Sequence, residues 1–157
     1  AARMSPDDSD TPPHGTCVAI DGKGVLITGA SGAGKTALAL TLIRRASAGG
    51  IEAGLVADDR VILEPDASGI IARCPAPLAG KIEVRGWGIA DVSDIAVPSV
   101  RLALLVRLVA AGDALRFAQE HRETVEGHGF PCLRLPTGPT APAPAAVLAA
   151  LGLPVWL

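Results

Sequence analysis

The octapeptide Gly29-Ala30-Ser31-Gly32-Ala33-Gly34-Lys35-Thr36 fits the pattern G-x-x-x-x-G-K-[ST] of a phosphate-binding P-loop. Residues 25–28 before it predict a strand, and the apolar run 37–43 after it predicts a helix. Glycines let the backbone turn tightly, so that successive N–H groups point at phosphate oxygens. The N-terminus of the following helix also favours anions. This strand–loop–helix setting therefore predicts nucleotide binding rather than an ordinary glycine-rich turn.

Two side chains of the octapeptide add chemistry to this backbone cradle. We expect Lys35 to reach the terminal phosphates as a point charge and the hydroxyl of Thr36 to ligate magnesium. The motif alone does not say which reaction follows.

Composition indicates a globular protein that has no affinity for nucleic acid. The 157 residues are 49% apolar and 19% charged, the net charge is −2, and the 14 basic residues form no run. Two Trp, two Phe and no Tyr give no platform for stacking bases. We expect a disordered tail over residues 1–13 and a single domain over 14–157. The start resembles no signal peptide and no apolar run has membrane-spanning length, which predicts a cytoplasmic protein with no membrane partner.

Hydrophobic patterning predicts a mixed sheet with few helices. Hairpin signals recur, whereas a doubly wound protein would show repeated βαβ units and this chain shows barely one. Residues 114–125 fit either a helix or a loop, and the proline-rich residues 136–144 should be extended. The expected strands are 16–20, 25–28, 53–57, 61–63, 70–72, 99–109 and 132–135, and the expected helices are 34–47 and 145–151.

Two further groups of charged residues are candidates for the site. Asp58 and Asp59 end an apolar strand, where one carboxylate can bind magnesium through water and the other can accept a proton during phosphoryl transfer. The alternative interpretation is that the two aspartates belong to a solvated turn. The P-loop, whose strand we expect next to theirs, makes a functional site the better interpretation. Glu83 and Arg85 share one face of an extended segment and suit a magnesium–phosphate site. Spacing alone slightly favours a surface strand with a charge pair for these two.

The remaining polar and aromatic candidates are less specific. His121 and His128 lack further metal ligands and should be solvated, and Trp87 and Trp156 should be core or interface residues. The three cysteines lack C-x-x-C spacing, which predicts buried thiols in a reducing compartment rather than a disulfide or zinc site. Spacing does not choose a charge-stabilising residue among Arg101, Arg107, Arg116, Arg122 and Arg134.

Four motifs together resemble the catalytic domain of HPr kinase/phosphorylase. In order they are His14-Gly15, the octapeptide, Val56-Ala57-Asp58-Asp59 and Ile82-Glu83-Val84-Arg85-Gly86-Trp87-Gly88-Ile89, and the resemblance is close over residues 13–92. It implies an α/β fold, a P-loop-containing mixed β-sheet domain of the HPr kinase and phosphoenolpyruvate carboxykinase-like type, with hairpins and few helices. It also implies a kinase that uses ATP and Mg²⁺ to phosphorylate a serine of HPr, a small phosphocarrier protein of the phosphotransferase system. The same pocket in this family can dephosphorylate that serine with inorganic phosphate.

The resemblance assigns phosphate and metal ligands residue by residue. Lys35 would contact the phosphates within the binding stretch formed by the octapeptide. Thr36 would ligate magnesium, Asp58 would support the metal, and Glu83 would be its second protein ligand.

The resemblance also assigns catalytic residues. Asp59 would take the seryl proton in the forward reaction and return one in reverse. His14 would assist Asp59, although a lone His is more often structural when judged from sequence alone. Arg116 would match a later arginine of the family.

Departures from the family pattern limit what the resemblance implies. From the resemblance we expect the short form found in some proteobacteria, without the N-terminal regulatory domain of longer members. It carries no Lys or Arg after Arg134, which argues against phosphorolysis. The family implies a homo-oligomer, typically a hexamer. Two other functions remain open: a non-catalytic nucleotide sensor that regulates a partner protein, and a small-molecule kinase or phosphatase that reuses the pocket.

Overall fold

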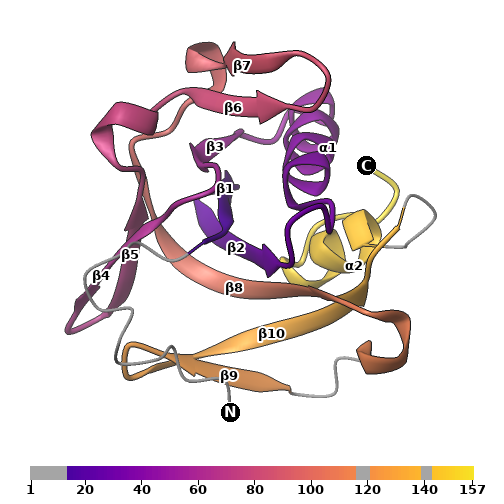
Figure 1. The fold of residues 1–157 in the computed structure, drawn as a ribbon. Coiled ribbons are helices and arrows are strands. Elements are labelled where there is room, and N and C mark those ends of the chain that lie inside the picture. Colours follow the sequence, from indigo (N-terminus) through magenta and orange to yellow (C-terminus); the bar gives the residue numbers. More distant parts are fainter. Residues whose placement is uncertain (1–13, 116–120, 139–142) are drawn as a thin grey trace.

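A curved eight-stranded sheet forms the body of the protein (Figure 1). The computed structural model describes residues 14–115, 121–138 and 143–157. The strand order is β3-β1-β2-β8-β10-β9, and the β4–β5 hairpin joins the sheet where β5 pairs with the start of β8. The strands are β1 Thr16–Ile20, β2 Lys23–Gly29, β3 Ala53–Ala57, β4 Ile62–Asp66, β5 Gly69–Arg73, β8 Ser99–Val109, β9 Arg122–Val125 and β10 His128–Pro136.

The centre of the sheet is parallel and its margins are antiparallel. β2 and β10 both run parallel to β8, with Ile27 and Leu133 in register with Val106. These central strands are apolar on both faces because helices or other strands cover each face. β1 and β2 form a tight hairpin in which Asp21 and Gly22 have positive φ of 54° and 74°, the conformation that a two-residue turn requires.

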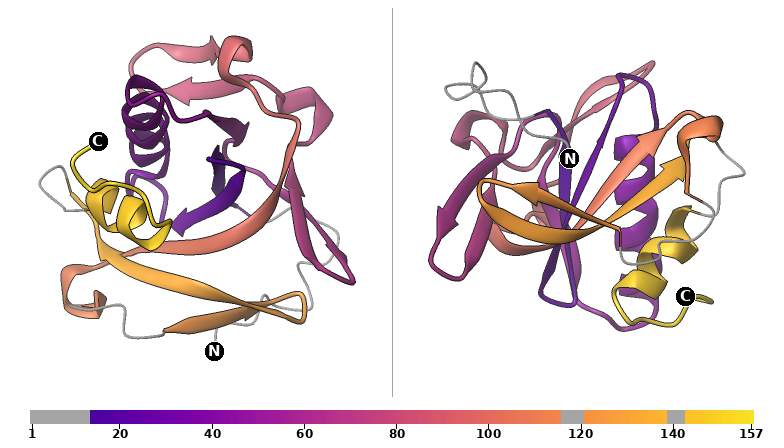
Figure 2. Two further views of the ribbon diagram at one scale, coloured as in Figure 1. Left: turned by 180° about the vertical axis from the view of Figure 1, so that it is seen from behind. Right: turned by 90° about the horizontal axis from the view of Figure 1, so that it is seen from below.

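Two helices cover one face of this sheet. α1 (Lys35–Ala48) and α2 (Ala143–Ala150) lie side by side on the same side of the strands (Figure 2). Leu42 of α1 and Val147 of α2 are fully buried in the core that they share with Ile27 and Val106 of the sheet. Short 3₁₀ turns connect other elements: η2 Ala76–Leu78, η3 Ser93–Ile95 and η4 Ala111–Asp113.

The opposite face of the sheet closes over a second apolar core. Leu26, Val61, Ile70 and Leu105 meet there because the sheet curves and the β4–β5 hairpin folds across it. The predicted strands over 16–20, 53–57 and 99–109 are confirmed to the residue.

A separate hairpin lies apart from the main sheet at the top of Figure 1. It consists of β6 (Lys81–Val84) and β7 (Gly88–Asp91), with Glu83 paired to Ile89. Ile82 is buried in the α1-side core and anchors this hairpin. Gly86 and Gly88 have φ of 83° and 122°, and no described atom lies within 4 Å of a Cβ built on either. The two glycines are therefore needed for backbone conformation and not for close packing.

The mixed sheet with few helices is confirmed, and several details differ from expectation. Residues 114–125 end in strand β9, because Glu123 and Val125 alternate inward against β10. The C-terminal helix begins at Ala143 rather than residue 145, since Pro144 is tolerated in a first helical turn. The expected tail over residues 1–13 lies outside the described residues. Neither helix of the described chain is long and apolar enough to cross a membrane.

Candidate functional site

The octapeptide forms the turn between β2 and α1, as the motif predicts. Gly34 is the N-cap of α1 with φ of 98°, and no side chain among the described residues caps the helix. The first N–H groups of α1 are therefore available to an anion. Gly32 has φ of 79°, so both glycines adopt the left-handed conformation that other residues rarely adopt.

Lys35 and Thr36 line the pocket beside this turn. The Lys35 ammonium donates to the carbonyl oxygens of Gly29 at 2.8 Å and Ala30 at 3.0 Å. Thr36 Oγ1 donates to Asp58 Oδ1 at 2.9 Å. The loop and the end of β3 are thus joined directly through a side chain of the motif.

Asp58 is the most buried carboxylate near the loop. Its Oδ1 also accepts a hydrogen bond of 2.9 Å from Thr16 at the start of β1. Two hydroxyl donors from different elements fix the orientation of this carboxylate. Its position between β1, β3 and α1 depends on the strand order β3-β1-β2, which brings these ends together.

Asp59 differs from Asp58 in exposure and backbone conformation. Its φ is 72°, which costs free energy for any residue with a side chain and recurs at functional sites. The Asp59 and His14 side chains are 70% and 64% exposed, and His14 Nδ1 lies 3.4 Å from Asp59 Oδ1. The N–H of Gly15 donates to the Asp59 carbonyl at 2.9 Å, which holds the strained residue in place. The structure therefore brings His14 to the exposed carboxylate.

The β6–β7 hairpin completes the site from the opposite side. Glu83 and Arg85 line the same pocket of about 510 Å³ as Lys35, Thr36 and Asp59. Of the two interpretations left open for Glu83 and Arg85, the pocket lining favours the site, although both residues are exposed.

Arg85 was a candidate from its alternation with Glu83, whereas Thr16 is a site residue that no sequence pattern indicated. A Cβ on Gly32 would lie 3.1 Å from Arg85 Nη2, so the guanidinium rests directly on the phosphate loop. No local pattern could indicate Thr16, since it lies 42 residues from its partner Asp58 in sequence.

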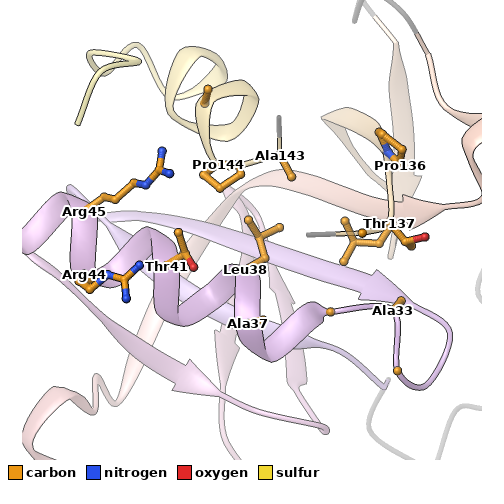
Figure 3. Close-up of a pocket in the computed structure, with 15 residues that line it drawn as sticks. Ala33, Ala37, Leu38, Thr41, Arg44, Arg45, Pro136, Thr137, Ala143 and Pro144 are labelled. Atoms are coloured by element: carbon orange, nitrogen blue, oxygen red, sulfur yellow. The ribbon is translucent and has the colours of Figure 1, made fainter. Parts of the chain in front are cut away.

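Six residues of the octapeptide, 31–36, line two adjoining pockets, and Gly29 and Ala30 are not lining residues of either. Ser31, Gly32, Gly34, Lys35 and Thr36 line the 510 Å³ pocket with the acidic groups. A second pocket of about 780 Å³ shares Gly32 and Gly34 with the first, adds Ala33, and continues along α1. Figure 3 shows that Arg44 and Arg45 of α1 lie at one end of this second pocket, and that Pro136 and Thr137 lie at the other end.

The donor set fits a magnesium–nucleotide complex. Magnesium prefers hydroxyl, carboxylate and water oxygens, and Thr36, Asp58 and Glu83 offer such oxygens within one pocket. The space beside Gly34 is open, because no described atom lies within 4 Å of the position that a Cβ would take there. Lys35 and Arg85 supply positive charge on the same side.

Among the described residues, the late arginines line neither pocket; they are Arg101, Arg107, Arg122 and Arg134. Arg101 forms two 3.1 Å hydrogen bonds to Asp66, and Arg122 donates to the Gly129 carbonyl at 3.0 Å. Arg116 lies outside the described residues, so its assigned catalytic role stays a prediction.

A buried ionic network surrounds Glu123. Arg107 donates to its carboxylate and also to Thr28 Oγ1 at 3.4 Å, at the residue before the P-loop. Arg134 Nη1 and His121 Nε2 lie 3.9 Å and 3.4 Å from Glu123 Oε1. Burial alone would raise the pKa of Glu123, but the hydrogen bond and charge of Arg107, with His121, lower it overall.

The sequence predicted a solvated His121, but its ring lies beside the buried carboxylate of Glu123. Donor atoms of His121, Glu123 and Cys132 lie within 4.8 Å of one another, which is the spacing of a metal-ligand set. Two guanidinium groups beside Glu123 repel a divalent cation, and burial raises the pKa of the Cys132 thiol to about 11. We interpret the group as a structural charge network. Cys17 is also buried, whereas Cys74 is half-buried, contrary to expectation.

Comparisons with known proteins match the chain to one family. The family model of the HPr Serine kinase C-terminal domain matches residues 8–114. An HPr kinase/phosphorylase of Aromatoleum aromaticum is 44% identical over 131 residues, which cover 77% of this chain and 40% of the relative. One from Bordetella pertussis is 45% identical over 104 residues, covering 62% and 32% of the two chains.

A solved structure extends the likeness to the fold. The Hpr(Ser) kinase/phosphatase from Coxiella burnetii superposes with a TM-score of 0.73 at 29% identity, over 89% of this chain and 87% of that one. The chain thus spans less than half the length of these two curated relatives and most of the solved structure. On the extent of the family-model match and this shared fold, the chain belongs to the HPr serine kinase C-terminal domain family.

Proposed function

We propose that this chain is an ATP- and Mg²⁺-dependent protein-serine kinase whose acceptor is an HPr-type phosphocarrier protein of the phosphotransferase system. The observation that carries the proposal is the meeting of a P-loop, a buried aspartate and an exposed aspartate in one pocket. A phosphate cradle alone would suit many nucleotide-binding proteins. An exposed carboxylate beside it adds the base that a phosphoryl acceptor requires.

The phosphates would lie on the P-loop in the 510 Å³ pocket, with Thr36, Asp58 and Glu83 as magnesium ligands. Bound magnesium supplies positive charge that neutralises phosphate oxygens and positions them. The nucleoside would lie in the adjoining 780 Å³ pocket, which has no acidic lining residue among those described and an apolar wall that includes Leu38 and Leu108. The shared glycines make the two pockets continuous.

Asp59 would act as the general base toward the acceptor serine. Its exposed carboxylate can accept the hydroxyl proton, and His14 at 3.4 Å would keep that carboxylate oriented. Asp58 is less suited, because both of its hydrogen bonds turn it toward Thr16 and Thr36. Lys35 and Arg85 would stabilise the charge that develops on the transferred group.

A direct assay tests the proposal. The protein is incubated with ATP labelled on the γ-phosphate, magnesium and an HPr-type phosphocarrier, and the acceptor is analysed for phosphoserine. Transfer that depends on magnesium supports the kinase. Tight nucleotide binding without transfer to any carrier would instead support the nucleotide sensor. Transfer to a small metabolite would instead support a small-molecule kinase that reuses the pocket.

The reverse reaction is expected to be the weaker one. Dephosphorylation of the serine by inorganic phosphate requires a second anion near the site, and Pro136, Thr137 and Gly138 at the wall of the nucleoside pocket carry no basic side chain. The same assay run from phosphorylated carrier and inorganic phosphate measures this directly.

We further propose a cytoplasmic homo-oligomer, a hexamer by resemblance to the family. A phosphocarrier acceptor supports the compartment. Analytical ultracentrifugation tests the assembly, and a monomer at micromolar concentration would contradict it.

A further inference from the structure

The β6–β7 hairpin exposes three large apolar side chains at its tip. Val84, Trp87 and Ile89 are 38%, 80% and 65% exposed, and we call them the hairpin rim. They make up half of the large apolar side chains that are exposed in the described part of the chain. Single exposed apolar residues are ordinary, but three within six residues around a Trp form a patch that is typical of an interaction surface.

The hairpin rim adjoins the phosphate pocket. Val84 lines that pocket together with Glu83 and Arg85. Ile89 is directly opposite Glu83 in the antiparallel pair, so its side chain projects from the same face as this pocket residue. Trp87 closes the turn, with its N–H donating to the Val84 carbonyl at 3.0 Å.

The hairpin is held rigidly enough to present this rim. Ile82 is 4% exposed in the core, and Ala90 packs against the same core from the opposite strand. The N–H of Val92 donates to the Gly80 carbonyl at 2.7 Å, which closes the base of the hairpin. Outward apolar side chains on an anchored hairpin lose little entropy when a partner covers them.

We propose that the hairpin rim is the docking surface for the folded protein that carries the acceptor serine, with Trp87 as its anchor. This inference rests on the proposed kinase function. A protein that delivers a hydroxyl to the exposed Asp59 must cover the mouth of the pocket that Asp59 shares with Val84 and Arg85. Specific interfaces cover about 800 Å² on each partner, so a docked protein would also contact surface around the pocket mouth. A metabolite acceptor would enter the pocket and leave the rim in water.

The chain contains a matched control for the anchor. Trp156 near the C-terminus is also 80% exposed and lines neither pocket. We expect Trp87→Ala to lower kcat/KM for the HPr-type acceptor about 10- to 30-fold, chiefly through KM, as for an interface hot spot. Trp156→Ala should leave kcat/KM unchanged. Nucleotide affinity and the melting temperature should be unchanged in both variants, because both side chains are exposed.

A binding readout separates docking from catalysis. The sequence has two Trp and no Tyr, so Trp156→Phe leaves Trp87 as the sole indole reporter. Addition of the unphosphorylated HPr-type carrier, chosen or engineered without Trp, should shift and quench its fluorescence. Equal kcat/KM for Trp87→Ala and Trp156→Ala, or no fluorescence change at saturating carrier, would overturn the proposal. A Trp87→Ala variant that changes the sedimentation coefficient instead would assign the rim to a second copy of the chain and also overturn it.

The two proposals fail in different ways. A fluorescence response without phosphotransfer by the unaltered enzyme would refute the kinase and leave the docking surface standing. Phosphotransfer that is insensitive to Trp87 would refute the docking surface alone.

Discussion

Thr16→Val probes the carboxylate around which the site is organised. The substitution removes the 2.9 Å hydrogen bond to Asp58 and keeps the shape and β-propensity of a residue that is 1% exposed. A hydrogen bond to a charged acceptor contributes about 1.5–3 kcal/mol, and the added buried methyl returns about 0.8 kcal/mol. We expect a net loss of about 1–2 kcal/mol in the free energy of unfolding, a fall of about 2–8 °C in Tm for a chain of this length.

The same variant has a functional consequence. Asp58 would keep its bond from Thr36 but lose its second restraint, so the magnesium concentration that half-saturates the enzyme should rise about tenfold, as for other lost supports of a metal ligand. Calorimetry and a magnesium titration measure the two effects. Thr124→Val, at an exposed position on β9, is the control and should change neither. Equal stability and magnesium dependence for Thr16→Val and the parent would refute the role of this bond.

Three further predictions concern the core, the ionic network and the thiols. Leu42→Ala, at a fully buried position, should cost about 2–5 kcal/mol in urea unfolding; a loss under 1 kcal/mol, well below that range, would show that α1 is not packed as described. The lowered pKa of Glu123 stabilises the fold above its unfolded value near 4.5, and this contribution is lost as pH falls through the folded pKa. Glu123→Gln should therefore be less stable than the parent at neutral pH, and the difference should shrink in acid; a constant difference would refute the pairing with Arg107. Burial raises the pKa of Cys17 to about 12, so a thiol reagent should modify the half-buried Cys74 well before Cys17, as peptide mapping would show.

Local sequence signals predicted the parts of the site that lie within one continuous element. The octapeptide specified its own backbone, because its glycines occupy positions that need positive φ and its Lys and Thr follow at the helix start. The exposed Asp59 and the buried Asp58 were both found because they end a recognisable strand. Their different roles were suggested only by family resemblance, since adjacent aspartates look alike in sequence.

Contacts between distant segments were not predictable from such patterns. Thr16 reaches Asp58 only because β1 lies between β2 and β3, and strand order is a property of the whole sheet. Glu83 and Arg85 looked like a surface pair because alternation gives the two faces of a strand but not what each face covers. Glu123 was overlooked for the same reason: its partners Arg107 and Arg134 come from other strands.

The most direct test compares Asp59→Asn with Asp58→Asn in single-turnover transfer from ATP to the HPr-type acceptor. Asp59 faces the open side of the pocket and Asp58 faces the hydroxyl groups of Thr16 and Thr36. We predict that Asp59→Asn keeps nucleotide and magnesium affinity but transfers about 10²–10⁴-fold more slowly, and that Asp58→Asn loses magnesium affinity first. Transfer by Asp59→Asn at the parent rate, with nucleotide equally bound, would contradict the assignment of Asp59 as the base.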